Sequence, residues 1–115
     1  MKSFMLLIRG GSEGWASMSP EQTQQTMQRY VGWTTELATS GQLVHADELD
    51  IAHTVVSGTG GEIVTDGPFA ETKDLISGYY MYHAEDMAAA VAIARACPAL
   101  AHGSSLEIHP VVQRG

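Results

Sequence analysis

The segment that decides the fold reads Asp66-Gly67-Pro68-Phe69-Ala70-Glu71-Thr72-Lys73-Asp74. Its composition is typical of a constrained turn that follows a strand-like run. The Asp66 carboxylate can accept hydrogen bonds from nearby backbone amides, and Pro68 fixes its own φ. Gly67 permits a positive φ, although a residue before proline favours extended geometry. With Phe69 as an apolar anchor, the segment predicts a tight and well-packed loop.

Two ionisable residues follow this turn at a spacing that matters. Glu71 and Lys73 are two positions apart, so in an extended segment their side chains project from the same face. They can form a solvated ion pair, which contributes little to stability. Alternatively, Asp66, Glu71 and Lys73 are candidate catalytic residues at a ligand site. Asp66 or Glu71 would then act as a general base or orienting carboxylate, and Lys73 would hold an anionic or carbonyl group.

The residues on either side of this loop read as strands. Upstream, residues 52–56 and 62–65 flank a glycine-rich turn, which predicts a hairpin, and residues 43–46 predict a further short strand. Downstream, residues 76–83 read as an aromatic strand, and we expect it at the centre of a subunit interface.

The three tyrosines of this aromatic strand cannot all face the same way. Tyr80 and Tyr82 share one face of the strand and Tyr79 lies on the other. One set should pack against helices and the other should lie on the opposite face of the sheet. Phenols that line a dimer cavity can orient a polar small molecule, or they can simply pack at an interface. We take Tyr80, Tyr82 and His109 as candidate ligand-binding residues.

The remaining segments complete the pattern. Residues 3–9 form a continuous apolar run, which predicts a central strand covered on both faces. The sequence Ser19-Pro20-Glu21-Gln22 is a strong helix start with a capping box. Residues 106–109 predict a last strand. Two apolar stripes at helical spacing predict buried helix faces, one from Met27, Tyr30, Val31, Thr34, Leu37 and Ala38, the other from Met87, Ala90, Val91, Ala94 and Cys97.

This order of elements indicates the fold class. Two helices on one face of an antiparallel sheet make an α+β sandwich. The repeated split βαβ unit is the ferredoxin-like arrangement. At 115 residues we expect one domain, residues 1–115.

Composition narrows the classes of function. The net charge is −7, from 6 basic and 13 acidic residues, which argues against nucleic acid and anionic membrane surfaces as partners. No apolar run is long enough to span a membrane. The single cysteine, Cys97, cannot form an internal disulfide, so we expect a cytoplasmic protein. None of the five histidines has zinc-site spacing, and we expect neither a metal nor a cofactor.

Residues 66–74 resemble the DGPFAETKE signature of the DGPF branch of the YCII-related family of small bacterial proteins. Eight residues match in a row, and Asp74 stands where the signature has Glu. The resemblance extends over nearly the whole chain. It implies a ferredoxin-like fold and dimers of the dimeric α+β barrel type, in which two sheets enclose a space.

The chain also departs from the family pattern in ways that limit what the resemblance implies. Some relatives pair a histidine on the first helix with an aspartate near the end of the second. Residues 20–40 contain no histidine here, and Cys97 occupies the aspartate position, so this dyad should not be carried over. In the last strand, His109 stands where relatives often have arginine, which replaces a fixed charge with a titratable imidazole.

The resemblance implies a homodimer that binds or transforms an unidentified polar small molecule in a dimer cavity near the 66–74 loop. Whether this is enzymatic stays open. The alternative is a non-enzymatic regulatory or interaction module, because relatives are often linked with sigma-factor-type transcription regulators, and an acidic surface suits a basic partner. A buried polar cavity around Asp66 and Lys73 would favour the first hypothesis. A filled interior with an exposed apolar patch would favour the second.

Overall fold

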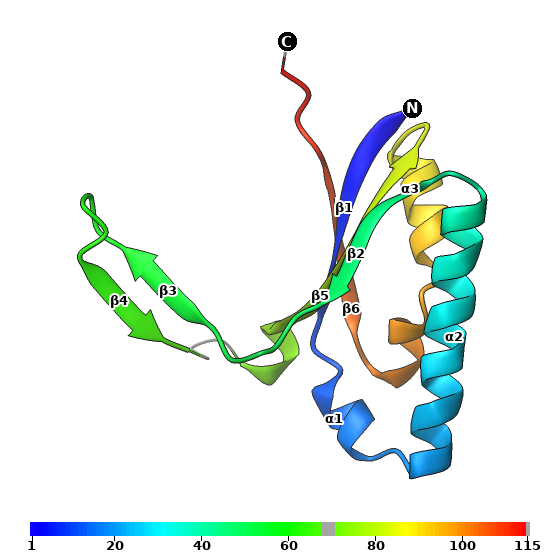
Figure 1. The fold of residues 1–115 in the computed structure, drawn as a ribbon, viewed down its shortest axis with the longest axis horizontal. Helices are drawn as coiled ribbons and strands as arrows, with labels where there is room; N and C mark the ends of the chain where they lie inside the picture. The colour runs from blue at the N-terminus through cyan, green and yellow to red at the C-terminus, as the bar shows by residue number, and fades with distance from the viewer. Residues whose placement is uncertain (68–70, 115) are drawn as a thin grey trace.

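A computed structural model describes residues 1–67 and 71–114 of the chain, and Figure 1 shows how their elements are arranged. In chain order, these elements are β1 (Lys2–Arg9), α1 (Ser12–Ala16), α2 (Pro20–Thr39), β2 (Leu43–Glu48), β3 (Thr54–Ser57), β4 (Ile63–Asp66), the 3₁₀ helix η1 (Thr72–Asp74), β5 (Ile76–Ala84), α3 (Met87–Ala94), the 3₁₀ helix η2 (Pro98–His102) and β6 (Ser105–Pro110).

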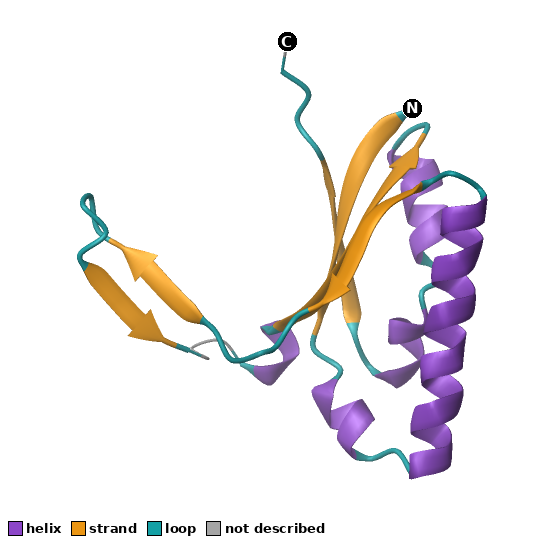
Figure 2. Ribbon diagram, viewed as in Figure 1, coloured by secondary structure: helices purple, strands orange, loops and turns teal. Residues whose placement is uncertain are grey.

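Four strands form the main sheet in the order β2-β5-β1-β6, and each neighbouring pair is antiparallel. Strands β3 and β4 form a separate antiparallel hairpin. Helices α2 and α3 lie together on one side of the main sheet, as Figure 2 shows. The predicted α+β class with an antiparallel sheet is therefore confirmed. The short helix α1 was not predicted, because its glycine-rich flanks hide a helical pattern of only five residues.

The core lies between the main sheet and these helices. Alternate residues of β1 and β5 point into it, and the side chains of Phe4, Leu6 and Tyr82 are at most 1% exposed. The Tyr82 hydroxyl donates a hydrogen bond of 2.8 Å to the carbonyl of Ala90 on α3, so the buried phenol is satisfied. Helices and sheet thus cover one face of β1 completely. Its other face, with Met5 and Leu7, is only half-buried, so the expected covering on both faces is not met within one chain.

Helix α2 begins as predicted but is rotated relative to the predicted stripe. Ser19 and Gln22 form the capping box, and Pro20 occupies the first turn. The fully buried residues, however, are Thr26, Trp33 and Leu37, whereas Met27 and Val31 are 51% and 64% exposed. The predicted stripe is therefore right for Leu37, and for Tyr30 and Thr34, which are half-buried. It is wrong for Met27, Val31 and Ala38, and it omitted Trp33, whose indole packs 4.7 Å from the ring of Tyr80.

The hairpin formed by β3 and β4 stands away from the rest of the chain. In Figure 1 it projects to the side opposite α2 and α3. We call residues 54–66 the arm, and the main sheet with its helices the body. Every residue of the arm is exposed. Among the described helices, none is both long and apolar enough to cross a bilayer.

Candidate functional site

The side of the main sheet that carries no helix presents two ordered rows of side chains. Cross-strand register aligns His45, Met81, Met5 and His109 in one row. It aligns Asp47, Tyr79, Leu7 and Glu107 in the next. We call these eight residues the open face. Its centre is apolar or aromatic and half-buried, and each edge strand contributes one histidine and one carboxylate.

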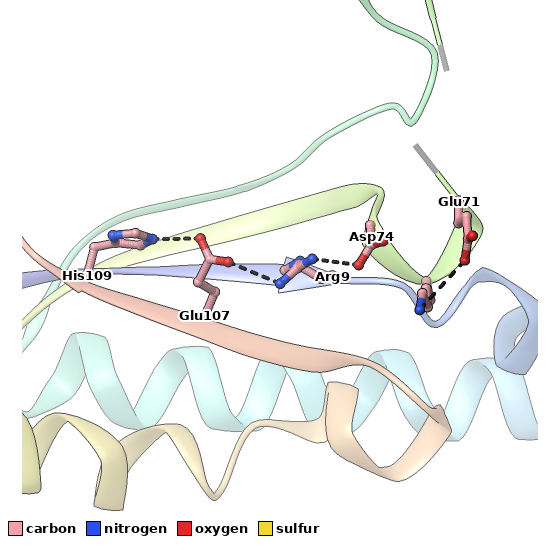
Figure 3. Close-up of polar contacts among 6 residues, drawn as sticks. Arg9, Glu71, Asp74, Glu107 and His109 are labelled. Atoms are coloured by element: carbon pink, nitrogen blue, oxygen red, sulfur yellow. Dashed lines mark hydrogen bonds and ion pairs between the residues drawn. The ribbon is translucent and has the colours of Figure 1, made fainter. Parts of the chain in front are cut away.

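The edge formed by β6 carries a chain of charged contacts, drawn in Figure 3. The ring Nε2 of His109 lies 2.6 Å from a carboxylate oxygen of Glu107. The other oxygen of Glu107 accepts a hydrogen bond of 3.1 Å from Arg9. The Arg9 guanidinium in turn donates to Asp74 at 2.6 Å. Asp74 ends the 66–74 segment, so this network connects the segment directly to the open face.

The electrostatics of this edge keep its carboxylate ionised. The hydrogen bond from His109, together with the positive charges of His109 and Arg9, holds the pKa of Glu107 below its ordinary value. An ionised Glu107 favours the tautomer of His109 that carries a proton on Nε2. In that tautomer, Nδ1 is the ring atom that can accept a proton or a hydrogen bond.

The edge formed by β2 repeats this chemistry with a tyrosine. The hydroxyl of Tyr79 lies 2.6 Å from Nδ1 of His45, and Nε2 of His45 lies 3.5 Å from the carboxylate of Asp47. With the proton on Nε2, the imidazole accepts from the phenol and faces the carboxylate with its N–H. Histidine and carboxylate are two positions apart on both edge strands, so each pair projects from one face of its strand.

The distance between the two edges limits what one ligand can reach. Strands β2 and β6 are separated by three strand spacings, or about 14 Å. A small molecule on one chain can therefore contact one histidine–carboxylate pair and the apolar centre, but not both pairs at once.

The structure places the three candidate residues of the loop outside this network. Lys73 and Glu71 form an ion pair of 3.6 Å, and their side chains are 75% and 78% exposed. Asp66 is exposed on β4 and accepts a hydrogen bond of 2.9 Å from Thr54 across the arm. In the described residues of this single chain, the arrangement is that of a solvated ion pair. The part of the predicted loop formed by residues 68–70 lies outside the described residues.

The expected backbone freedom of Gly67 is also not used. Glycines with positive φ occur elsewhere in the chain, but Gly67 is not one of them. Its N–H donates a hydrogen bond of 2.6 Å to the carbonyl of His53. This fits the extended geometry that a following proline imposes.

Of the candidate ligand-binding residues, only His109 lies on the open face. Tyr82 is fully buried and Tyr80 is 8% exposed, and both face the helices, where burial raises the pKa of each phenol. The hydroxyl of Tyr80 lies 2.6 Å from that of Thr34 on α2. The predicted division of the tyrosines between two faces is thus confirmed, and Tyr79 is the one that reaches the open face.

Sequence reasoning missed five charged or titratable residues of the candidate site: Arg9, His45, Asp47, Asp74 and Glu107. Arg9 lies on the same face of β1 as Met5 and Leu7, because every second residue of a strand points to the same side. The sequence therefore contained enough information to place Arg9 on the helix-free side. The spacing of Glu107 and His109, two positions apart on one strand, also indicates that their side chains lie on the same face. The contact between Arg9 and Glu107 joins positions 98 apart, and no local pattern predicts it.

Two further features of the body bear on chemistry. Cys97 is 3% exposed, and burial raises the pKa of its thiol to about 11, so it is not a nucleophile at neutral pH. Two shallow surface cavities, of about 450 and 520 Å³, lie along the helices near Arg29, away from the open face and from Glu71. Within residues 1–67 and 71–114, no three histidine, cysteine or acidic side chains gather as a metal site would require.

The chain is similar to a known family of protein domains. A family model described as the YCII-related domain matches residues 3–113. A search of curated proteins found no match.

Proposed function

This chain belongs to the YCII-related domain family, and we propose that it is a homodimer that binds a polar small molecule against the open face of its sheet. Within the family, residues 66–74 support assignment to the DGPF branch. The strand order β2-β5-β1-β6, with two helices on one side, supports a ferredoxin-like arrangement of the dimeric α+β barrel type.

One observation carries the proposal. The open face sets an apolar centre, formed by Met5, Leu7 and Met81, between two histidine–carboxylate pairs. Ligand sites typically combine apolar walls with a few well-placed polar groups. A monomer leaves this centre partly in water, whereas a second sheet placed over it would exclude water and close a cavity. Exclusion of water would also strengthen the polar contacts at the edges.

The charges of the face indicate the kind of ligand. Arg9 is already paired with Asp74 and Glu107, so its positive charge is neutralised. Asp47 and Glu107 leave the edges acidic. We therefore expect a neutral or cationic molecule with a hydroxyl or amine group, rather than an anion. His109 and His45 could donate or accept a proton on such a ligand, so binding and catalysis are both compatible with the site.

The 66–74 segment would act through its last residue. Asp74 holds Arg9, and Arg9 holds Glu107, so the segment would position the pair that contacts the ligand. Asp66, Glu71 and Lys73 remain candidates at the margin of this site. The family match gives no support to the alternative of a transcription-linked interaction module, which stays a prediction.

The test is a ligand screen read at the open face. A library of small hydroxyl- and amine-containing compounds would be added to isotope-labelled protein, and the imidazole signals of His109 and His45 would be followed by NMR. Compounds that shift the His109 signal should bind at least about tenfold more weakly to Glu107→Gln, because a charged hydrogen-bond partner is lost. The matched variant Glu85→Gln, at an exposed site beyond β5, should bind them as the wild type does. If compounds that shift the His109 signal bind Glu107→Gln as tightly as the wild type, or if no compound shifts either histidine signal, the function lies elsewhere.

A further inference from the structure

The arm exposes apolar side chains that a single chain never covers. Val56 and Val64 are paired across β3 and β4 and are 62% and 61% exposed. On the opposite face of the arm, Val55 and Ile63 are 41% and 51% exposed. Both faces of the arm thus carry exposed apolar side chains. Contiguous apolar surface of this kind usually marks an interaction site.

The contacts within the arm do not explain how it is held. Among the described residues, its side-chain hydrogen bonds stay inside the hairpin, such as Thr54 to Asp66 and Thr65 to the carbonyl of Val55. A two-stranded hairpin without further packing is at best marginally stable in water. The arm therefore requires a surface that the body of its own chain does not supply.

The exposed surface area of the chain also indicates that part of its surface is covered by another molecule. A compact monomer of this mass exposes about 6,100 Å². This chain exposes 7457 Å², so about 1,400 Å² is in excess. Its radius of gyration is 15.8 Å, against about 13 Å for a compact domain of this length. A standard interface buries about 800 Å² on each partner, so the excess is more than enough for a stable dimer.

We propose that the arm clasps a second copy of this chain. The arm projects from the body on the side away from the helices, which is the side of the open face (Figure 1). A body that covers the open face must therefore also meet the arm. In a two-fold dimer each chain offers both an arm and an open face. A single symmetric interface therefore covers both arms and both open faces. This inference rests on the dimer of the proposed function and adds the element that holds it together.

The charge of the arm favours this occupant over another protein. Residues 54–66 carry two acidic residues, Glu62 and Asp66, and no lysine or arginine. A basic partner would be expected to meet more acidic groups than these on the surface that it contacts. Because the chain carries a net charge of −7, two copies repel one another, and the exposed apolar side chains of the arm supply contacts that can offset this repulsion.

The first experiment measures the assembly state of arm variants. Val56→Asp combined with Val64→Asp should weaken the dimer by about 100-fold or more in Kd, because two carboxylates would be buried without partners. The control is Val31→Asp, since Val31 is equally exposed, at 64%, but lies on α2. Sedimentation velocity over a dilution series gives the Kd of each protein, and circular dichroism verifies that the variants fold.

Each outcome decides between the two proposals. A wild-type dimer that is lost in the arm variant and kept in Val31→Asp supports the clasp. A wild-type dimer that survives in the arm variant overturns the clasp and leaves the dimer of the proposed function intact. If the wild-type protein is monomeric at high concentration, both the proposed dimer and the proposed clasp are wrong.

A second measurement avoids any risk to folding. Val56→Cys and Val31→Cys each add one exposed thiol, while the native Cys97 is buried and unreactive. In concentrated protein, where the variants are dimers, the thiol at position 56 should react with a maleimide at least about tenfold more slowly than the thiol at position 31. The rate at position 56 should follow the fraction of molecules whose arm is released from the partner. Dilution below the dimer Kd should remove the difference. Equal rates in the concentrated protein would mean that the arm is free or awaits a different partner, and would overturn the proposal.

Discussion

The body and the arm are built from similar strands but bury them to opposite extents. Residues of β1 and the arm are both rich in branched apolar side chains, and both form regular antiparallel pairs. Leu6 of the body is 0% exposed, whereas Val64 of the arm is 61% exposed. The difference shows that an apolar strand pattern predicts pairing, but which molecule covers the strand is a separate question.

The largest expected contrast comes from truncating the core of the body. Leu6→Ala should lower the free energy of unfolding by about 2–5 kcal/mol, because it removes a fully buried side chain and leaves a cavity. Leu100→Ala, at a position that is 45% exposed, should cost far less. Urea unfolding of both variants measures the difference. Equal losses would mean that Leu6 does not lie in a tightly packed core of the body.

A glycine substitution in the body should have a smaller effect. A β-carbon added at Gly14 would collide with the backbone carbonyl of His102, so α1 could not keep its position against η2. We expect Gly14→Ala to cost about 1–3 kcal/mol. Gly32→Ala is the matched control, because open space surrounds Gly32 on α2, and it should be neutral or stabilising. Thermal unfolding of the two variants would reveal the contrast, and a neutral Gly14→Ala would show that α1 is not tightly docked.

The body should also respond to acid through His102, whereas the arm should not. The ring of His102 is packed 4.8 Å from Trp15 and hydrogen-bonded at 3.0 Å to the Tyr30 hydroxyl. Burial lowers its pKa below the ordinary value of 6.5, so the folded protein binds a proton less readily than the unfolded chain. The stabilisation is therefore complete above 6.5 and is lost as the pH falls toward the lower folded pKa.

Urea unfolding from about pH 8 to about pH 5 would measure this dependence, since histidine titrates in that range. The loss of stability with acid should be shallower in His102→Gln than in the wild type. His53→Gln, at an exposed histidine beside the arm, should keep the wild-type slope. A His102→Gln slope equal to that of the wild type would mean that the imidazole titrates freely.

The smallest effect is expected in the arm itself. In protein diluted enough to be monomeric, Val64→Ala should change the free energy of unfolding by less than about 0.5 kcal/mol, as for other exposed side chains. At high concentration the same variant should lose more stability, because dimer formation adds to the stability of the wild type. A loss above about 1 kcal/mol in the monomer would indicate that the arm packs within its own chain.

The sequence predicted the elements of the body well because their signals are local. The capping box at Ser19 and the alternation of Tyr79, Tyr80 and Tyr82 each follow from residues within a few positions of one another. Which tyrosine faces the helices did not follow, because that depends on where α2 docks. The composition of the open face could not be predicted from the sequence for the same reason. Its rows depend on the register of β1 with β5 and β6, which joins residues from opposite ends of the chain.

The position of β1 in the sheet has a consequence for synthesis. Both of its neighbours, β5 and β6, lie far downstream, and Arg9 is 67 positions from its partner Ile76. At about 5–20 residues per second on the ribosome, β1 waits roughly 3–13 s before β5 exists. During that time Phe4, Leu6 and Ile8 have no strand to pair with. We therefore expect chaperones to bind the exposed apolar residues of the nascent chain. The folding rate should be governed by these late, long-range strand pairings.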